Sequence, residues 1–217
     1  MILVPIKDLK NAKQRLAPVL EQAARTALAQ AMLQDVAEAL AAWNNRPEVA
    51  LVTRDPFALA LASRCDFEVI ADHANSSETE AIAMATYVCE MRAIRTTLVI
   101  PADIPLITAA ELQRVYDAAP EEGSVLVPAG DGRGTNAALR SPAGLFPLRF
   151  GNDSFKPHLA AAQATGRPCI VLPLSGIGVD VDNPADLKQL IELPGNTHAQ
   201  RLARQWDLRD YPIAANE

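Results

Sequence analysis

The chain has 217 residues, of which 49% are hydrophobic and 21% are charged, as expected for one folded globular domain. Its formal net charge of −6 argues against a general nucleic-acid-binding protein, but it leaves room for a nucleotide in a small basic pocket. There is no apolar run of about 18 residues and no secretory signal pattern, so we expect a cytoplasmic protein without a membrane span. Cys65, Cys89 and Cys169 lack metal-ligand spacing and are predicted to be reduced, buried or partly buried thiols.

Short apolar runs alternate with helical patterns along the first two thirds of the chain. The runs are rich in Val, Ile and Leu and predict strands buried on both faces, at residues 1–6, 48–53, 67–71, 96–102 and 124–129. Helical patterns cover residues 20–43 and begin near residues 77, 108 and 154. This alternation predicts an α/β fold, with a mostly parallel sheet, right-handed crossovers and helices on both faces.

The last third of the chain is less regular. We expect a strand at residues 135–140, a loop and helix at 151–166, a strand at 168–173, a helix from 183 and a terminal helix and tail from about 194. Pro184 suits the first turn of its helix. Because no repeat, low-complexity tract or linker interrupts the chain, residues 1–217 are predicted to form a single domain.

The first candidate site follows the first predicted strand. Ligands in such sheets bind at the carboxyl ends of the strands. Lys7, Lys10, Lys13 and Arg15 lie there within nine residues and can neutralise a triphosphate. The alternative is a solvated basic loop. The segment lacks the glycines and the Gly-Lys-Ser/Thr ending of a Walker P-loop.

Two separated acidic segments supply candidate metal ligands. Asp103 directly follows a predicted strand, and Thr108 is the better cap for the helix after it. Asp180 is expected to point into the site, while Asp182 or Asn183 caps the next helix. Magnesium prefers one or two carboxylates together with phosphate oxygens and water, and Asp103 with Asp180 meets that need.

Two further segments suggest an anion cradle. The glycines of residues 130–134 allow close backbone approach to an anion, although a surface turn fits equally well. The helix predicted to begin at Ser154 presents first-turn N–H groups that suit a phosphate or a carboxylate. His158 is interpreted as a packed or surface histidine rather than a catalytic base.

Taken in this order, the segments resemble the 2-phospho-L-lactate guanylyltransferase family over about residues 2–190. That family acts in the biosynthesis of a deazaflavin redox cofactor. The motifs that carry the resemblance are Lys7 with Ala12-Lys13-x-Arg15-Leu16, Pro-Ala-Asp-x-Pro-Leu at 101–106, Gly-x-Gly-Thr at 132–135, Arg-Phe-Gly-x-x-Ser-Phe at 149–155, and Asp-Val-Asp-x-Pro-x-Asp-Leu at 180–187.

The resemblance implies a nucleotidyltransferase fold, Rossmann-like and similar to that of GT-A glycosyltransferases. It implies transfer of GMP from GTP to 2-phospho-L-lactate, phosphoenolpyruvate or 3-phospho-D-glycerate, with release of pyrophosphate. The resemblance further implies that a downstream transferase uses the product. It is also compatible with a homodimer of this protein. By position, the resemblance places Asp103 and Asp180 on Mg²⁺, Lys13 and Arg15 on the nucleotide phosphates, Leu3, Pro5, Glu78 and Thr79 at the nucleotide, and Thr135, Gly151 and Ser154 at the acceptor with Lys7 nearby.

One segment departs from the family pattern. Thr79 stands where the family commonly has an Asn near the base, and Glu78 stands where Leu is usual. A Glu78 carboxylate can accept hydrogen bonds from guanine N1–H and the 2-amino group, or it can be an ordinary first-turn acid. The alternatives are therefore a related nucleotidyltransferase with another base or acceptor, and a nucleotide- or metabolite-binding protein without turnover.

Overall fold

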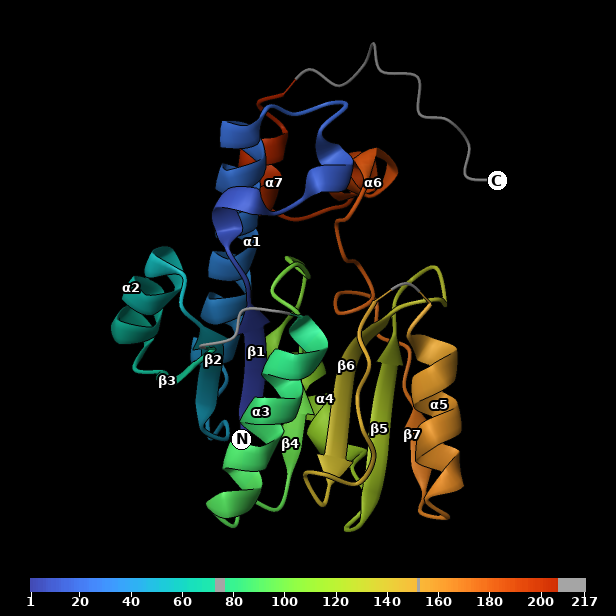
Figure 1. Cartoon of the computed structure of the whole chain (residues 1–217). Helices are drawn as coiled ribbons and strands as arrows, with labels where there is room; N and C mark the ends of the chain where they lie inside the picture. The colour runs from blue at the N-terminus through green and yellow to red at the C-terminus, as the bar shows by residue number, and fades with distance from the viewer. Residues whose placement is uncertain (73–76, 152, 207–217) are drawn as a thin grey trace.

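The computed structural model describes residues 1–72, 77–151 and 153–206. Within those residues seven strands form one sheet, in the order β3-β2-β1-β4-β6-β5-β7 (Figure 1). The strands are β1 (Ile2–Ile6), β2 (Val49–Thr53), β3 (Glu68–Ala71), β4 (Thr97–Val99), β5 (Gly123–Pro128), β6 (Thr135–Ser141) and β7 (Cys169–Val171).

The sheet is mostly parallel, as predicted. Strand β1 pairs in parallel with β2 and β4, β2 with β3, and β5 with β7. Strand β6 is antiparallel to both β4 and β5. Because β6 runs the other way, its first residue, Thr135, lies at the edge where the parallel strands end. The reversal thus adds residues to the ligand-binding edge.

Helices and short 3₁₀ turns connect the strands. They are η1 (Leu9–Asn11), η2 (Gln14–Leu16), α1 (Gln22–Ala41), α2 (Pro56–Cys65), α3 (Glu78–Met91), α4 (Ala109–Asp117), α5 (Phe155–Ala164), α6 (Pro184–Glu192) and α7 (His198–Ala203). Thr108 caps α4 by accepting from the Glu111 N–H, as predicted. Asn183 caps α6, with Pro184 in its first turn.

Two observations differ from the predicted elements. Helix α2 is absent from the prediction, although the Asp55 carboxylate caps it by accepting from the Phe57 and Ala58 N–H groups. The prediction that every early strand is buried on both faces is wrong for β3, in which Val69 is 37% exposed. Strand β3 is at the edge of the sheet, so its outer side lacks a covering neighbour.

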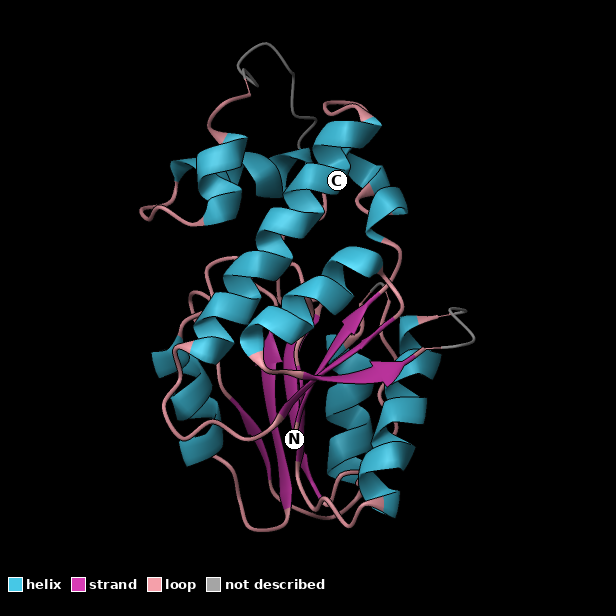
Figure 2. Ribbon diagram, turned by 90° about the vertical axis from the view of Figure 1, so that its left-hand side faces the viewer, coloured by secondary structure: helices cyan, strands magenta, loops and turns pink. Residues whose placement is uncertain are grey.

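Helices cover both faces of the sheet (Figure 2). One apolar cluster joins the sheet to α1, α2 and α4, and a second joins it to α3 and α5. The three cysteines are free thiols, with Cys89 buried and Cys65 and Cys169 partly buried, as predicted. No helix in the described ranges is long and apolar enough to cross a membrane.

A third apolar cluster lies beyond the sheet, at the top of Figure 1. It joins η2, the first half of α1, α6 and α7, and it contains Leu16 and Val181, both fully buried. The Asp35 carboxylate of α1 accepts hydrogen bonds from the His198 and Ala199 N–H groups at the start of α7. We call this cluster the helical cap. It anchors the segment around Leu16 and the segment around Val181, which lie on either side of the strand ends.

Candidate active site

Lys13 lies at the centre of the charged residues that gather at the strand ends. Its Nζ atom is 2.6 Å from Asp103 Oδ2 and 2.8 Å from Asp182 Oδ1. The backbone of Lys13 is left-handed, with φ of 55°, between the two 3₁₀ turns. Leu16, buried in the helical cap, anchors the segment directly after it. The side chain of Lys13 is only 9% exposed, so its ammonium depends on the two carboxylates for charge compensation.

Burial and charge act in opposite directions on these groups. Burial alone would lower the pKa of Lys13, but the nearby carboxylates of Asp103 and Asp182 hold it above its ordinary value. Burial alone would raise the pKa of Asp182, but Lys13 holds it below its ordinary value. Both groups are therefore ionised at neutral pH and form a stable ion pair.

Asp180 occupies a different position from Asp182. Asn136 on β6 donates through Nδ2 to Asp180 Oδ1, at 2.9 Å, and to the Ile177 carbonyl, also at 2.9 Å. Burial and the negative charges of Asp103 and Asp182 raise the pKa of Asp180 to about 6. Asp180 is thus held by a neutral amide in a region rich in negative charge, which favours the approach of a cation.

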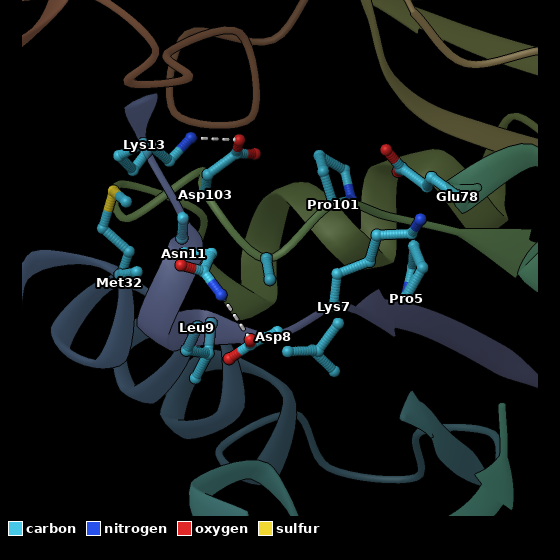
Figure 3. Close-up of a pocket in the computed structure, with 14 residues that line it drawn as sticks. Pro5, Lys7, Asp8, Leu9, Asn11, Lys13, Met32, Glu78, Pro101 and Asp103 are labelled. Carbon is cyan, nitrogen blue, oxygen red and sulfur yellow. Dashed lines mark hydrogen bonds and ion pairs between the residues drawn. The ribbon is translucent and has the colours of Figure 1, made fainter. Parts of the chain in front are cut away.

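Of the hollows at this edge, the one that we call the first hollow has a volume of about 330 Å³ and is drawn in Figure 3. Lys13 and Asp103 lie at one end, and Glu78 lies at the other, near Lys7 and Pro5. The lining comes from β1, the loop after it, α1, the start of α3 and the segment after β4, with the residues Pro5, Ile6, Lys7, Asp8, Leu9, Asn11, Ala12, Lys13, Ala29, Met32, Glu78, Pro101, Ala102 and Asp103.

The second hollow has a volume of about 270 Å³ and shares the charged centre. Its lining includes Arg15, Gly151, Asp180 and Asp182. Since Lys13 and Asp103 line the first hollow and Asp182 lines the second, the Asp103–Lys13–Asp182 ion pairs separate the two. These two hollows are therefore adjacent binding volumes with a charged junction between them.

Glu78 belongs to the first turn of α3, whose cap is Ser77. Burial, followed by the negative charge of Asp103, raises the pKa of Glu78 to about 7. Its side chain also lines the first hollow. Glu78 is therefore a pocket residue as well as a first-turn acid.

Three of the residues expected at the nucleotide do not line the first hollow. Arg15 lines the second hollow instead. Leu3 is fully buried within the sheet. The Thr79 hydroxyl accepts from the Phe150 N–H at 3.0 Å and donates to the Phe150 carbonyl at 3.3 Å. Thr79 thus ties α3 to the turn that precedes Gly151, on the side of the second hollow.

Of the residues expected at the acceptor, Thr135, Gly151 and Ser154 are on the side of the second hollow, whereas Lys7 lines the first. Gly151, with φ of 143°, lines the second hollow, and Thr135 and Ser154, each 4% exposed, directly follow Gly134 and Asp153, which also line it. The Thr135 N–H donates to Ser154 Oγ at 3.1 Å. His158 is packed, as interpreted from the sequence, since it is only 1% exposed.

Asp182 and Asn136 are site residues that the sequence prediction does not assign. Asp182 is predicted only as an alternative cap for α6, but Asn183 fills that role and leaves Asp182 for Lys13. The only sequence signal that places Asp182 in the site is its spacing of two residues from Asp180. Asn136 lies in the glycine-containing segment, where nothing in the sequence indicates that it holds Asp180.

The donor set fits a magnesium ion that takes most of its ligands from a nucleotide. In the part of the chain that the structure describes, no three His, Cys, Asp or Glu residues form a metal cluster. Asp103 and Asp180 offer carboxylate oxygens close enough for the charge of Asp103 to raise the pKa of Asp180. One or two carboxylates, completed by phosphate oxygens and water, is the usual arrangement for magnesium with a nucleotide.

Comparisons with known proteins find guanylyltransferases that match nearly the whole chain. The phosphoenolpyruvate guanylyltransferase of Roseiflexus castenholzii is 35% identical over 207 residues, covering 95% of each chain. The 2-phospho-L-lactate guanylyltransferase of Methanobrevibacter smithii is 27% identical, covering 99% of this chain and 94% of that one.

Solved structures show the same fold at low identity. A nucleotidyl transferase from Methanothermobacter superposes with a TM-score of 0.57 at 16% identity, covering 94% of this chain and 97% of that one. A 4-diphosphocytidyl-2C-methyl-D-erythritol synthase superposes with a TM-score of 0.57 at 14% identity, covering 87% and 95%. The predicted nucleotidyltransferase fold is thereby confirmed. The family described as "Guanylyl transferase CofC like" matches residues 1–210, and this chain therefore belongs to that family of guanylyltransferases.

Proposed function

We propose that this protein is a magnesium-dependent, cytoplasmic guanylyltransferase that transfers GMP from GTP to a phosphorylated three-carbon acid and releases pyrophosphate. The observation that carries the proposal is the placement of Lys13 between Asp103 and Asp182, at the junction of two hollows. One hollow would take the nucleotide and the other the acceptor, so that the reacting phosphates meet at the junction.

The proposed reaction is an in-line displacement at the α-phosphorus of GTP. A phosphate oxygen of the acceptor forms the new P–O bond, and the bond to the bridging oxygen breaks, releasing pyrophosphate. The acceptor phosphate is already anionic near neutral pH, so the reaction needs no strong general base. The protein would contribute positioning and charge neutralisation, with Lys13 and Arg15 at the nucleotide phosphates.

Asp103 and Asp180 would hold the magnesium ion. When bound, the ion supplies positive charge at the reacting phosphate. The Asn136 amide orients the Asp180 carboxylate, and Asp182 keeps the Lys13 ammonium at the junction. Each of these groups has a defined partner before any ligand binds, which is the arrangement that electrostatic catalysis requires.

Glu78 is the proposed recognition group for guanine. It lines the far end of the first hollow, and Pro5 and Lys7 line the same end (Figure 3). Its carboxylate would accept from guanine N1–H and the 2-amino group, and these contacts would favour the ionised form. Cytosine has no matching pair of donors, so this group favours GTP over CTP. Leu3 supports the hollow from within the sheet, and Thr79 acts through Phe150.

The proposed acceptors are phosphoenolpyruvate, 2-phospho-L-lactate and 3-phospho-D-glycerate. The two curated relatives named above support the first two. Gly151 would meet the acceptor directly, and Thr135 and Ser154, which directly follow the lining residues Gly134 and Asp153, would support it, whereas Lys7 lies at the far end of the first hollow. The activated product would then pass to a transferase in the synthesis of a deazaflavin cofactor. We also propose that the whole chain acts as one domain, because the site uses residues 7 to 182 and the helical cap reaches Ala203.

The decisive experiment combines a substrate panel with one variant. The protein is incubated with magnesium, each of the four ribonucleoside triphosphates and each candidate acid, while pyrophosphate release and product mass are followed. We expect release only with GTP and one or more of the acids. Asp103→Asn should nearly abolish release without unfolding the chain, whereas Asp117→Asn, an exposed change on α4, should have no effect.

Nucleotide binding without release of pyrophosphate under all conditions would reject catalysis in favour of a sensing protein. Release with CTP in preference to GTP would reject the assignment of guanine. An Asp103→Asn variant with a rate near that of the wild type would reject the metal assignment.

A further inference from the structure

We propose that His158 is a positioning residue for the acceptor site, which it builds as a neutral imidazole with its proton on Nδ1. The inference deepens the proposed function and rests on it for the identity of the acceptor. His158 lies in the first turns of α5 and takes no part in the reaction described above. Its two ring nitrogens contact two separate parts of the predicted acceptor cradle.

The tautomer follows from the partners of the ring. The Arg149 backbone N–H lies 2.7 Å from Nε2, and an amide N–H can only donate. Nε2 must therefore accept, and it carries no proton. The remaining nitrogen, Nδ1, then carries the proton of the neutral ring and donates to Thr135 Oγ1 at 2.9 Å. The contacts of His158 thus determine which way the proton points.

The neutral state follows from the surroundings. His158 is 1% exposed, and its ring contacts Phe150 edge-on, with the ring centroids 5.1 Å apart. Burial, followed by the positive charge of Arg140, lowers the pKa of His158 to about 4. A protonated ring would also direct a second N–H at the Arg149 N–H. The ring is consequently neutral over the whole physiological range.

This tautomer determines what Thr135 and Ser154 offer to a ligand. The Thr135 hydroxyl oxygen accepts from His158, so its own hydrogen remains available for another acceptor. The Ser154 hydroxyl oxygen accepts from the Thr135 N–H, which leaves its hydrogen available too. Both hydroxyls are therefore able to donate, and they belong to residues that directly follow Gly134 and Asp153 in the lining of the second hollow. Two hydroxyl donors beside this hollow suit an anion, such as the carboxylate or phosphate of the proposed acceptor.

His158 also fixes the turn that carries Gly151. It binds the Arg149 N–H, while Thr79 binds both backbone groups of Phe150. Three backbone groups on two consecutive residues of this turn are thus held by side chains from α3 and α5. Changing His158 should therefore weaken the acceptor site and leave the nucleotide site, on the other side of the charged junction, unaltered.

The kinetic test compares three variants. His158→Phe keeps a packed ring but removes both hydrogen bonds, and we expect the acceptor KM to rise roughly ten- to a hundredfold. The KM for GTP should stay within about twofold. His158→Gln returns an acceptor for the Arg149 N–H and should recover part of the loss. His198→Gln, at a partly buried histidine on α7 outside both hollows, is the matched control and should change neither constant.

Two readouts do not depend on the reaction. Spectra of ¹⁵N-labelled histidine, assigned by the signal that His158→Gln removes, should show the proton on Nδ1 between about pH 5 and 8. The Arg149 amide should exchange slowly in the wild type and faster in His158→Phe. These measurements decide the role of His158 even if none of the acids is a substrate, an outcome that would reject the proposed function alone.

An Nε2–H tautomer, or a ring that titrates between about pH 6 and 7, would overturn the proposal. An acceptor KM for His158→Phe within about twofold of the wild type would overturn it as well. If His158→Phe does not fold, the wild-type tautomer and the His158→Gln kinetics decide the matter.

Discussion

Replacement of Lys13 by methionine tests the charged junction directly. Methionine fills most of the space of the lysine chain but cannot bind Asp103 or Asp182. The variant would leave two carboxylates facing each other across the former ammonium, with only solvent and Arg15, 3.8 Å from Asp182, to offset their repulsion. We therefore expect a loss of both stability and activity, of different sizes.

The structure sets the size of each loss. Breaking a fully buried ion pair costs about 3–5 kcal/mol, and an exposed pair costs about 0–1 kcal/mol. Asp103 is 27% exposed and Asp182 is 42% exposed, so solvent screens both carboxylates and we expect about 1–2 kcal/mol. For a chain of this size that lowers Tm by about 2–8 °C. Loss of a positioned charge at the reacting phosphates should lower kcat roughly 10²- to 10³-fold.

The stability difference should not depend on pH between about pH 6 and 9. The pKa of Lys13 is raised in the folded chain, so its stabilisation is complete below its unfolded value of about 10.4 and is lost only as pH rises above it. Thermal unfolding and pyrophosphate release measure the two losses. Lys10→Met, an exposed change in the same loop, is the matched control. A Lys13→Met variant that matched the control in rate would refute the role of the ion pairs in catalysis.

Three further changes separate the parts of the site. The pKa of Glu78 is about 7 in the folded chain, which therefore keeps a proton that the unfolded chain releases above about pH 4.3. The free energy of unfolding consequently falls as the pH rises from about 4.3 to 7. Denaturation with urea should show Glu78→Gln to be more stable than the wild type at pH 8 and equally stable at pH 4. Thr79→Val removes both hydrogen bonds to Phe150, and steady-state kinetics should show a roughly tenfold rise in the acceptor KM that Thr79→Ser does not. Asn136→Ala releases Asp180, and titration with magnesium should show a roughly tenfold higher requirement for the metal.

Each of these predictions has an outcome that contradicts it. If Glu78→Gln is no more stable than the wild type at pH 8, the Glu78 carboxyl is solvated rather than buried. A change in GTP affinity for Thr79→Val, with the acceptor KM unaltered, would return that residue to the nucleotide site. An unchanged metal requirement for Asn136→Ala would separate Asp180 from the metal.

The layered fold was predictable because the apolar strand cores and helix signals are local. The strands from 1–6 to 124–129 were recognisable by composition, and the caps at Thr108 and Asn183 by their position before a helical pattern. Helix α2 has an equally local start signal in Asp55-Pro56, but the prediction omits the helix because its Ala- and Leu-rich pattern is short. The exposure of β3 depends on its place in the sheet order, which no local pattern contains.

Site residues that directly follow a strand could be predicted from the sequence. Site residues that meet only through the packing of distant segments could not. Asp103, at the end of a strand, is such a predictable position. Asp182 pairs with a lysine 169 residues away, and only the folded helical cap brings the two together. Thr79 shows the same limit, since its partner Phe150 is 71 residues distant. A hydroxyl side chain in a helix can form hydrogen bonds with a nucleotide base, with a backbone group or with water. Its position in the sequence does not show which of these partners it has.

The helical cap has a consequence for how the protein acquires activity. Leu16 and Val181, which flank the two sides of the charged junction, are buried in the same cluster as Ala199 and Ala203 of α7. Contacts between segments so distant in the chain form slowly during folding, after local structure. A chain whose sheet has formed but whose α7 has not yet docked would lack part of the packing around Leu16 and Val181, and these residues position Lys13 and Asp182. Recovery of guanylyl transfer during refolding would therefore lag behind the return of helical signal, and the enzyme's own turnover would report the completion of its tertiary structure.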